Sequence, residues 1–166
     1  VGTSYTKFAS ESFVDEIADA LGKDPLALRL ELCRDHPRAR AVLRRAAEMA
    51  EWDRPRDDGR ALGIALANYK AGAVSAGVAE ISINRESGRI KIHDFWLAAD
   101  PGMVVAPDNV RAQLEGNIVF GISSSLYERI SIADGRVEQS NFHDYTLMRM
   151  ADVPNITIDL MPRDAA

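Results

Sequence analysis

The chain of 166 residues is 46% hydrophobic and 27% charged, proportions that are typical of one globular domain or of a large part of one. It carries 20 lysines and arginines against 25 acidic residues, and this net charge of −5 argues against nucleic acid as a partner. Because Cys33 is the single cysteine, an internal disulfide and a cysteine-based metal cluster are excluded, and Cys33 is expected to be a packed thiol. No apolar run is long enough to suggest a membrane span.

Residues 8–52 have the apolar spacing of three helices. The first should end at Gly22, because glycine readily adopts the left-handed conformation that ends a helix. Asp24 is expected to cap the second, with Pro25 at its first position, and the third follows Pro37. We expect the polar side of the third helix to face solvent, with a contact to another subunit as the alternative. That side carries Arg38, Arg40, Arg44 and Arg45.

The period of the pattern changes to two after residue 60, which predicts strands. Residues 63–100 should form three strands, with one turn at Ala71-Gly72 and a hairpin connection before Arg89. The large apolar residues of these strands are core candidates: Ile81, Ile83, Ile90, Ile92 and Trp96.

Pro107 and Asp108 are predicted to open a long helix. After it, Asp134-Gly135 favours a two-residue hairpin turn, and residues 155–162 read as a last short strand. The expected fold class is α+β, with a mainly antiparallel sheet and one helix packed on it. We expect one unit over 1–166, helical over 1–52 and sheet plus helix over 60–166, excised from a longer protein.

The predicted helix contains features that weaken it, namely Gly116, Gly121 and three serines at 123–125. Each interior glycine costs roughly 0.5–1 kcal/mol relative to alanine. A surface with so little side chain suits close packing of the helix on the sheet. It equally suits a large flat ligand that approaches the backbone and the side-chain amide of Gln113. The residues alone leave both explanations open.

The three histidines have no histidine or cysteine partner at the spacing of metal ligands. His36 and His93 are therefore expected to be structural. His143 and Asp144 lie in the segment NFHDY, which we expect to be a loop held down by its two aromatic residues, with a cleft lined by His143 and Asp144 as the alternative. Nucleophile-elbow, P-loop and dinucleotide motifs are absent, so motifs alone reveal no chemistry.

Three stretches together cover nearly the whole chain: VGTSYTKFASESFVDEIADALGKDPLALR, GVAEISINRESGRIKIHDFWLAAD, and the run from residue 98 to 162 that contains GRVEQSNFHDY. They resemble the molybdenum-cofactor subunit of the xanthine dehydrogenase and aldehyde oxidase family. The resemblance implies a parent subunit several times longer than this chain. The competing hypothesis is a non-catalytic binding module that uses the glycines for packing and the NFHDY loop for a protein partner.

The resemblance also implies a cofactor, a reaction and a partner for the parent protein. The cofactor is molybdenum held by molybdopterin, in bacterial members as the cytosine dinucleotide. The reaction hydroxylates an N-heterocycle or an aldehyde with water-derived oxygen, and electrons leave through a small [2Fe-2S] subunit. The family's catalytic glutamate would fall beyond Ala166, so we expect neither cofactor nor turnover from this stretch alone, and the compartment, cytoplasm or periplasm, stays open.

The resemblance assigns expected roles to five residues, all in cofactor binding. Gln113 matches the glutamine of a Q-x-E-G-x-x-x-x-G helix, whose amide is expected to hydrogen-bond the pterin. Gly116 and Gly121 match the glycines of that motif and would allow close approach. Gly2 and Ser4 match a loop near the molybdenum site.

Overall fold

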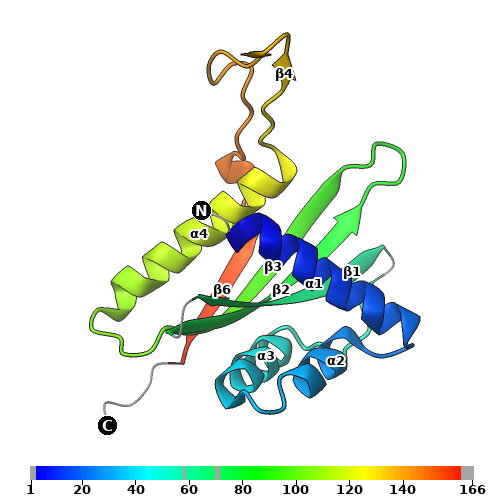
Figure 1. The fold of residues 1–166 in the computed structure, drawn as a ribbon, viewed down its shortest axis with the longest axis vertical. Coiled ribbons are helices and arrows are strands. Elements are labelled where there is room, and N and C mark those ends of the chain that lie inside the picture. The colour runs from blue at the N-terminus through cyan, green and yellow to red at the C-terminus, as the bar shows by residue number, and fades with distance from the viewer. Residues whose placement is uncertain (1–2, 58, 70–71, 162–166) are drawn as a thin grey trace.

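The computed structural model describes residues 3–57, 59–69 and 72–161 and has the expected α+β architecture (Figure 1). Three helices precede three strands, and a long helix, a small hairpin and a final strand follow. The helices are α1 (Thr3–Ala20), α2 (Pro25–Leu32), α3 (Pro37–Met49), α4 (Pro107–Leu126) and a 3₁₀ turn, η1 (Met150–Asp152). The strands are β1 (Arg60–Tyr69), β2 (Ala73–Ile83), β3 (Ile90–Asp100), β4 (Ile132–Ala133), β5 (Arg136–Val137) and β6 (Asn155–Leu160).

The boundaries of the first three helices follow the sequence signals, with one exception. Gly22 has φ 61°, and the Asp24 carboxylate accepts a hydrogen bond from the N–H of Ala27 at 2.8 Å, so both predictions are confirmed. The exception is the start of α1. Helix was expected from residue 8, but α1 begins at Thr3, because no glycine or proline interrupts the stretch before it.

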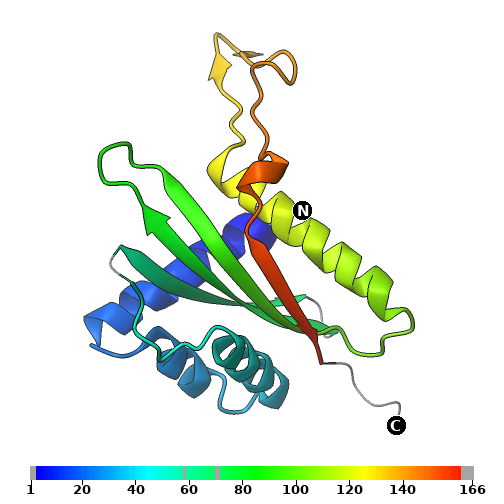
Figure 2. The same cartoon turned by 180° about the vertical axis from the view of Figure 1, so that it is seen from behind.

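The main sheet has the strand order β1-β2-β3-β6. The first three strands form an antiparallel meander, and β6 joins β3 in parallel, as Figure 2 shows from behind. A parallel pair requires a crossover connection, and α4 with the small hairpin supplies it. The predicted hairpin turn is confirmed, since Asp134 and Gly135 both have positive φ.

One face of the sheet is covered by α3 and is here called the closed face. The apolar stripe of α3 fits tightly against it, and Val42, Leu43 and Ala46 are completely buried. They pack on side chains of the strands that include Val78 and Ala98. The alanines of α3 bring its backbone close to the strands, so this layer is dense.

The arginines of α3 do not simply face solvent, so that prediction is wrong for three of the four. Arg38 forms a two-pronged ion pair with the buried Asp100 at the end of β3, at 2.5 and 2.7 Å. Arg45 pairs with Asp159 of β6 at 2.5 Å. Arg40 donates to the carbonyl of Leu30 at 2.6 Å. Their acceptors lie far along the chain or on a neighbouring helix, so spacing within α3 does not reveal them.

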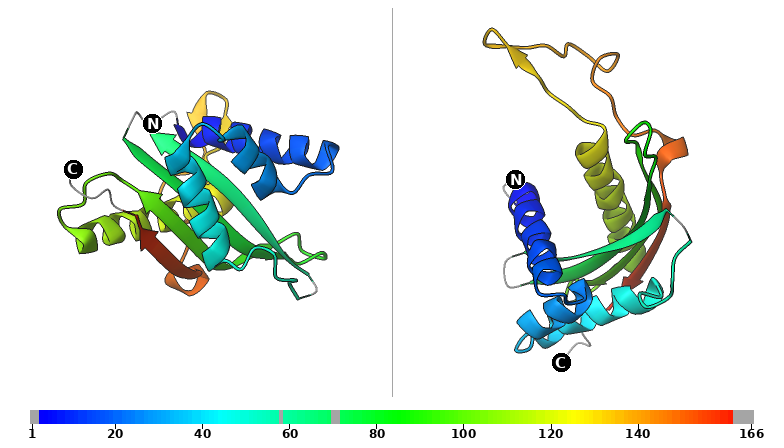
Figure 3. Two further views of the ribbon diagram at one scale, coloured as in Figure 1. Left: turned by 90° about the horizontal axis from the view of Figure 1, so that it is seen from below. Right: turned by 90° about the vertical axis from the view of Figure 1, so that its right-hand side faces the viewer.

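The opposite face of the sheet carries α1 and α4 and is here called the open face (Figure 3). Ile118 and Ile122 of α4 pack there on Leu97 and Ala99 of β3. Helix α4 ends beside the hairpin between β2 and β3, where Leu126 and Ile90 line the same hollows. Ile83 and Ile90 lie at that hairpin and are 53% and 36% exposed, so their prediction as core residues is wrong.

Helix α1 is anchored by one buried arginine. Arg29 of α2 is 3% exposed and donates to Glu11 at 2.9 Å and to Asp15 at 2.6 Å. The Glu11 carboxylate also accepts the N–H of Leu66 at 2.9 Å, at the edge of β1. One cluster of charges thereby joins α1, α2 and the sheet.

Residues 128–149, here called the arm, project away from the body of the fold (Figure 1). Two contacts fix its base: the Tyr145 hydroxyl donates to Glu128 at 2.7 Å, and the Met148 N–H donates to the Ser123 hydroxyl at 3.1 Å. Farther out, Phe142 is 67% exposed. The expectation that aromatic residues hold this loop down is therefore right for Tyr145 and wrong for Phe142.

Candidate functional site

Helix α4 turns one side toward the sheet and leaves another side uncovered. Ile118 and Ile122 are buried, whereas Gln113, Gly116 and Gly121 are all exposed. Residues three and four apart lie on neighbouring faces of a helix, so Gln113 and Gly116 share one exposed surface. Within the described residues the Gln113 amide makes no hydrogen bond, and both its donor and its acceptor are available.

The space around the two glycines tests the packing explanation for them. A Cβ atom added at Gly116 or at Gly121 would meet no atom within 4 Å. Gly77 shows the opposite case, because a Cβ there would lie 3.0 Å from the ring of Phe95. Close packing on the sheet therefore accounts for Gly77 and not for the glycines of α4. The ligand explanation fits the structure, and the glycine-packing element of the binding-module hypothesis is wrong.

The three serines of α4 are accounted for locally. Ser124 and Ser125 donate to the carbonyl of Gly121, at 3.0 and 2.7 Å. Ser123 is buried and accepts the N–H of Met148, which ties the base of the arm to the helix. The serines thus satisfy backbone groups in the last turn of α4 and leave Gln113 and the glycines as the groups open to a ligand.

An apolar trough runs along the open face between α1 and α4. It consists of two adjoining hollows of about 640 and 650 Å³. Small side chains from β1 and β2 form much of its floor, so the helices on either side stand apart. Both hollows are lined by Ser75, Ile81, Phe95, Leu97 and Ser125.

The predicted residues near the N-terminus are only partly placed. Gly2 lies outside the described residues. Ser4 belongs to the first turn of α1, so the expected loop is wrong at this position. Farther along α1, Lys7 lines the trough together with Ser125 near the end of α4. Gln113 lies about three helical turns earlier, so the structure does not bring this part of α1 to it.

The NFHDY segment forms a self-contained turn in the arm. The Asp144 carboxylate accepts the N–H groups of Asn141 and Ser140 at 2.9 Å each. These backbone donors hold the pKa of Asp144 at about 2, below its usual value of 3.8. His143 is exposed beside it. Asp144 therefore serves to hold its own turn, and the structure gives no support to a cleft built around it.

Other titratable groups show structural roles as well. Hydrogen bonds from Ser123 and then Tyr145 lower the pKa of Glu128, and the bond to Glu128 raises the pKa of Tyr145. Burial raises the pKa of the Cys33 thiol, which packs against the closed-face core as predicted. Within the described part of the chain, no three His, Cys, Asp or Glu side chains gather as a metal site.

Sequence reasoning missed a polar hollow at the hairpin end of the sheet. It is lined by Ser82, Lys91, His93 and Asn155, among others. A signal was present, because the run IKIHD alternates apolar and polar residues and then places two polar residues together. Such a break in alternation indicates a β-bulge.

Comparison with known proteins agrees with this geometry. The family of the molybdopterin cofactor-binding domain matches residues 39–154. The chain is 43% identical, over its whole length, to the beta subunit of the isoquinoline 1-oxidoreductase of Brevundimonas diminuta, and 32% identical over 94% of its length to a nicotinate dehydrogenase subunit of Pseudomonas putida. It spans 22% of the first relative and 14% of the second.

The solved structures show the same relationship. The quinoline 2-oxidoreductase of Pseudomonas putida 86 superimposes with a TM-score of 0.53 and 26% sequence identity. The match covers 56% of this chain and 12% of that one. Of the helices in the described residues, none has both the length and the apolarity needed to cross a bilayer. The resemblance found in the sequence is thereby confirmed, and the chain belongs to the molybdopterin cofactor-binding domain family.

Proposed function

We propose that the parent protein is a molybdenum hydroxylase and that α4 forms part of its cofactor-binding surface. The observation that carries this proposal is the exposed Gln113 amide about one turn from Gly116, with open space at Gly116 and, about two turns along the helix from Gln113, at Gly121. A bound molybdenum cofactor supplies the redox centre for hydroxylation with water-derived oxygen. The relatives named above act, by their names, on isoquinoline, nicotinate and quinoline, which supports an N-heterocyclic substrate, with an aldehyde as the alternative.

The residues of this chain would bind and orient the cofactor without moving a proton. A side-chain amide has donors and an acceptor, so Gln113 matches the mixed donor and acceptor edge of a pterin. Gly116 and Gly121 present bare backbone, which lets a flat ring system approach the helix closely. The residues present therefore fit the proposed group, and no catalytic residue is assigned to the described chain.

Finer features of the parent protein belong to the same proposal. We further propose that the cofactor is in its cytosine dinucleotide form and that a small [2Fe-2S] subunit accepts the electrons. Both relatives from Brevundimonas diminuta and Pseudomonas putida are named as subunits, which supports an assembly of several chains. Release of cytidine monophosphate on acid treatment of the parent protein would test the first feature, and co-purification of an iron–sulfur subunit would test the second.

The central test replaces Gln113 with alanine in the parent subunit. We expect molybdenum and pterin content to fall severalfold, while the circular dichroism spectrum stays that of the wild type. The loss of a hydrogen bond between neutral groups costs about 0.5–1.5 kcal/mol, and more when the remaining partner is left unpaired. Molybdenum is measured by mass spectrometry and pterin by fluorescence after oxidation.

Glu115→Ala is the matched control, because Glu115 is an exposed polar residue of the same helix that points away from the Gln113 surface. It should leave cofactor content unchanged. Wild-type cofactor content in Gln113→Ala would remove Gln113 from the site.

A further inference from the structure

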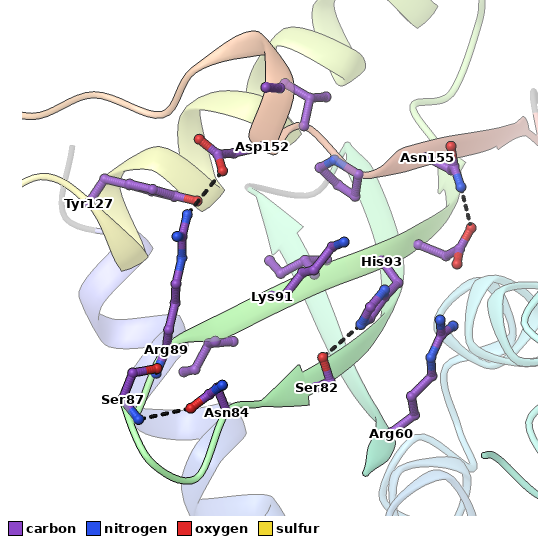
Figure 4. A pocket seen from close by; sticks show the side chains of 16 residues that line it. Arg60, Ser82, Asn84, Ser87, Arg89, Lys91, His93, Tyr127, Asp152 and Asn155 are labelled. Atoms are coloured by element: carbon purple, nitrogen blue, oxygen red, sulfur yellow. Dashed lines mark hydrogen bonds and ion pairs between the residues drawn. The ribbon is translucent and has the colours of Figure 1, made fainter. Parts of the chain in front are cut away.

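The polar hollow lies at the hairpin end of the sheet (Figure 4), and neither Gln113 nor the glycines of α4 line it. Its volume is about 840 Å³. The hairpin ends of β2 and β3, the start of β6 and η1 surround it. Polar side chains dominate its walls: Arg60, Ser82, Asn84, Arg89, Lys91, His93, Asp94, Asp152 and Asn155.

A β-bulge creates the polar wall contributed by β3. Glu80 pairs with Asp94 and Ile81 pairs with Ile92, so His93 is an extra residue without a partner in β2. The extra residue turns His93 and Asp94 to the same side of the sheet. Ile92 and Phe95 then both face the apolar core of the open face, where they pack.

The carboxylates that line the hollow are already engaged. Asp94 accepts a hydrogen bond from the amide of Asn155 at 3.1 Å. Asp152 pairs with Arg89 at 3.2 Å. Figure 4 draws Arg89 beside Asp152, and a dashed line at the Asn155 amide. Arg89 offsets the charge of Asp152, whereas Asp94 keeps its negative charge because Asn155 is neutral.

A third carboxylate lies behind the wall and is matched by two arginines. Glu80 is 5% exposed and contacts Arg60 at 2.5 Å and Arg56 at 3.5 Å. This buried cluster carries one more positive charge than negative. Arg60 lines the hollow, and its guanidinium keeps further N–H donors beyond the one it gives to Glu80.

Lys91 is the cation without a partner. It lines the hollow, and within the described residues its amino group makes no hydrogen bond or ion pair. His93 lies on the same strand and forms a 2.7 Å hydrogen bond with the hydroxyl of Ser82 (Figure 4). The hollow thus combines an ion-paired Asp152, a hydrogen-bonded Asp94, the Lys91 ammonium without a partner in the described residues, and the Ser82–His93 hydrogen bond.

We propose that this polar hollow binds a small oxyanion, a carboxylate or a phosphate, with Lys91 as its principal counter-charge. The Arg60 guanidinium supplies further donors from the closed-face side of the hollow, and Ser82 and His93 supply hydrogen-bonding groups. Charge-assisted hydrogen bonds to oxyanions are the strong class, and the excess positive charge makes the hollow an exception on a chain of net charge −5. The proposal does not depend on the cofactor role of α4.

The test is isothermal titration calorimetry of the parent protein with inorganic phosphate and, in a second series, with acetate. Chloride keeps the ionic strength constant in both series. We expect saturable binding of at least one of them, and which one binds identifies the anion class. Lys91→Met keeps the length of the side chain and removes its charge. It should weaken binding about tenfold, the loss of one hydrogen bond to a charged group.

Arg85→Met is the matched control. Arg85 is an exposed cation of the same hairpin, does not line the hollow, and its removal changes the net charge equally. It should change binding less than twofold, because exposed charges at this range are screened by salt. Absence of binding to both anions, or equal losses in the two variants, would overturn the proposal.

Discussion

The two faces of the sheet differ in how completely this chain covers them. On the closed face, Val42 and Leu43 are fully buried and the ends of α3 are tied to the strands by ion pairs. On the open face, Phe8 of α1 is 75% exposed and the glycines of α4 have empty space beside them. The comparison separates two conditions of a sheet face: one is filled by the helix that packs on it, and the other leaves side chains and backbone uncovered, where we propose that the cofactor binds.

The largest expected effect comes from breaking the cluster that joins the two faces. Arg29→Met should destabilise the chain by about 3–5 kcal/mol, because it leaves the partly buried Glu11 carboxylate without its cation. Urea denaturation measures the loss, and limited proteolysis should show cleavage in α1 first.

Arg34→Met provides the contrast. Arg34 and its partner Asp35 are 78% and 81% exposed, and such pairs contribute roughly 0–1 kcal/mol. If the two variants lost similar stability, Arg29 would not be the anchor of α1.

A smaller effect, of opposite sign, is expected on the open face. Gly116→Ala and Gly121→Ala should each stabilise α4 by roughly 0.5–1 kcal/mol, because alanine is the better helix former and the added Cβ meets no atom. In the parent protein the same changes should lower molybdenum content if the proposed site is correct, since the added methyl groups would occupy the proposed cofactor surface.

Gly77→Ala sharpens the comparison, because its Cβ would press on the ring of Phe95. It should destabilise the sheet. A gain in stability without any loss of molybdenum in the α4 variants would show that the open glycines do not serve cofactor binding.

The smallest effect concerns the arm. The pKa of Asp144 is lowered to about 2, so the stabilisation of its turn is fully present above the usual value of 3.8 and is lost as the pH falls toward 2. A carbon-detected NMR titration of the carboxylate should show a midpoint near 2. Asp144→Asn should remove this pH dependence from the amide signals of Ser140 and Asn141. A midpoint at 3.8 would mean that the turn does not depend on the charge.

Local signals in the sequence predicted most of the fold. Asp24 and Pro25 mark the start of α2, and Asp134-Gly135 marks the hairpin turn, because each acts on its neighbours in the chain. The partners of Arg38 and Arg45 were not predictable in this way, since Asp100 and Asp159 are 62 and 114 residues away. Long-range ion pairs have no local signature.

The candidate site was predicted by resemblance more than by pattern. Spacing placed Gln113 beside Gly116 on a helix but left packing and ligand binding equally open. Only the three-dimensional structure, with its empty space at both glycines, separates these explanations. The polar hollow was missed because its residues come from β2, β3, η1 and β6, which pairing and the crossover bring together.

The parallel pairing of β6 with β3 has a consequence for the order of folding. The β1-β2-β3 meander is built from neighbouring segments and can form as soon as residue 100 is available. β6 is added only after α4 and the arm have been synthesised, and closing so long a loop is slow. Until then one edge of β3 is unpaired, and an unpaired edge is where two nascent chains can join. In the finished fold β6 pairs with that edge, so prompt addition of β6 would limit aggregation during synthesis.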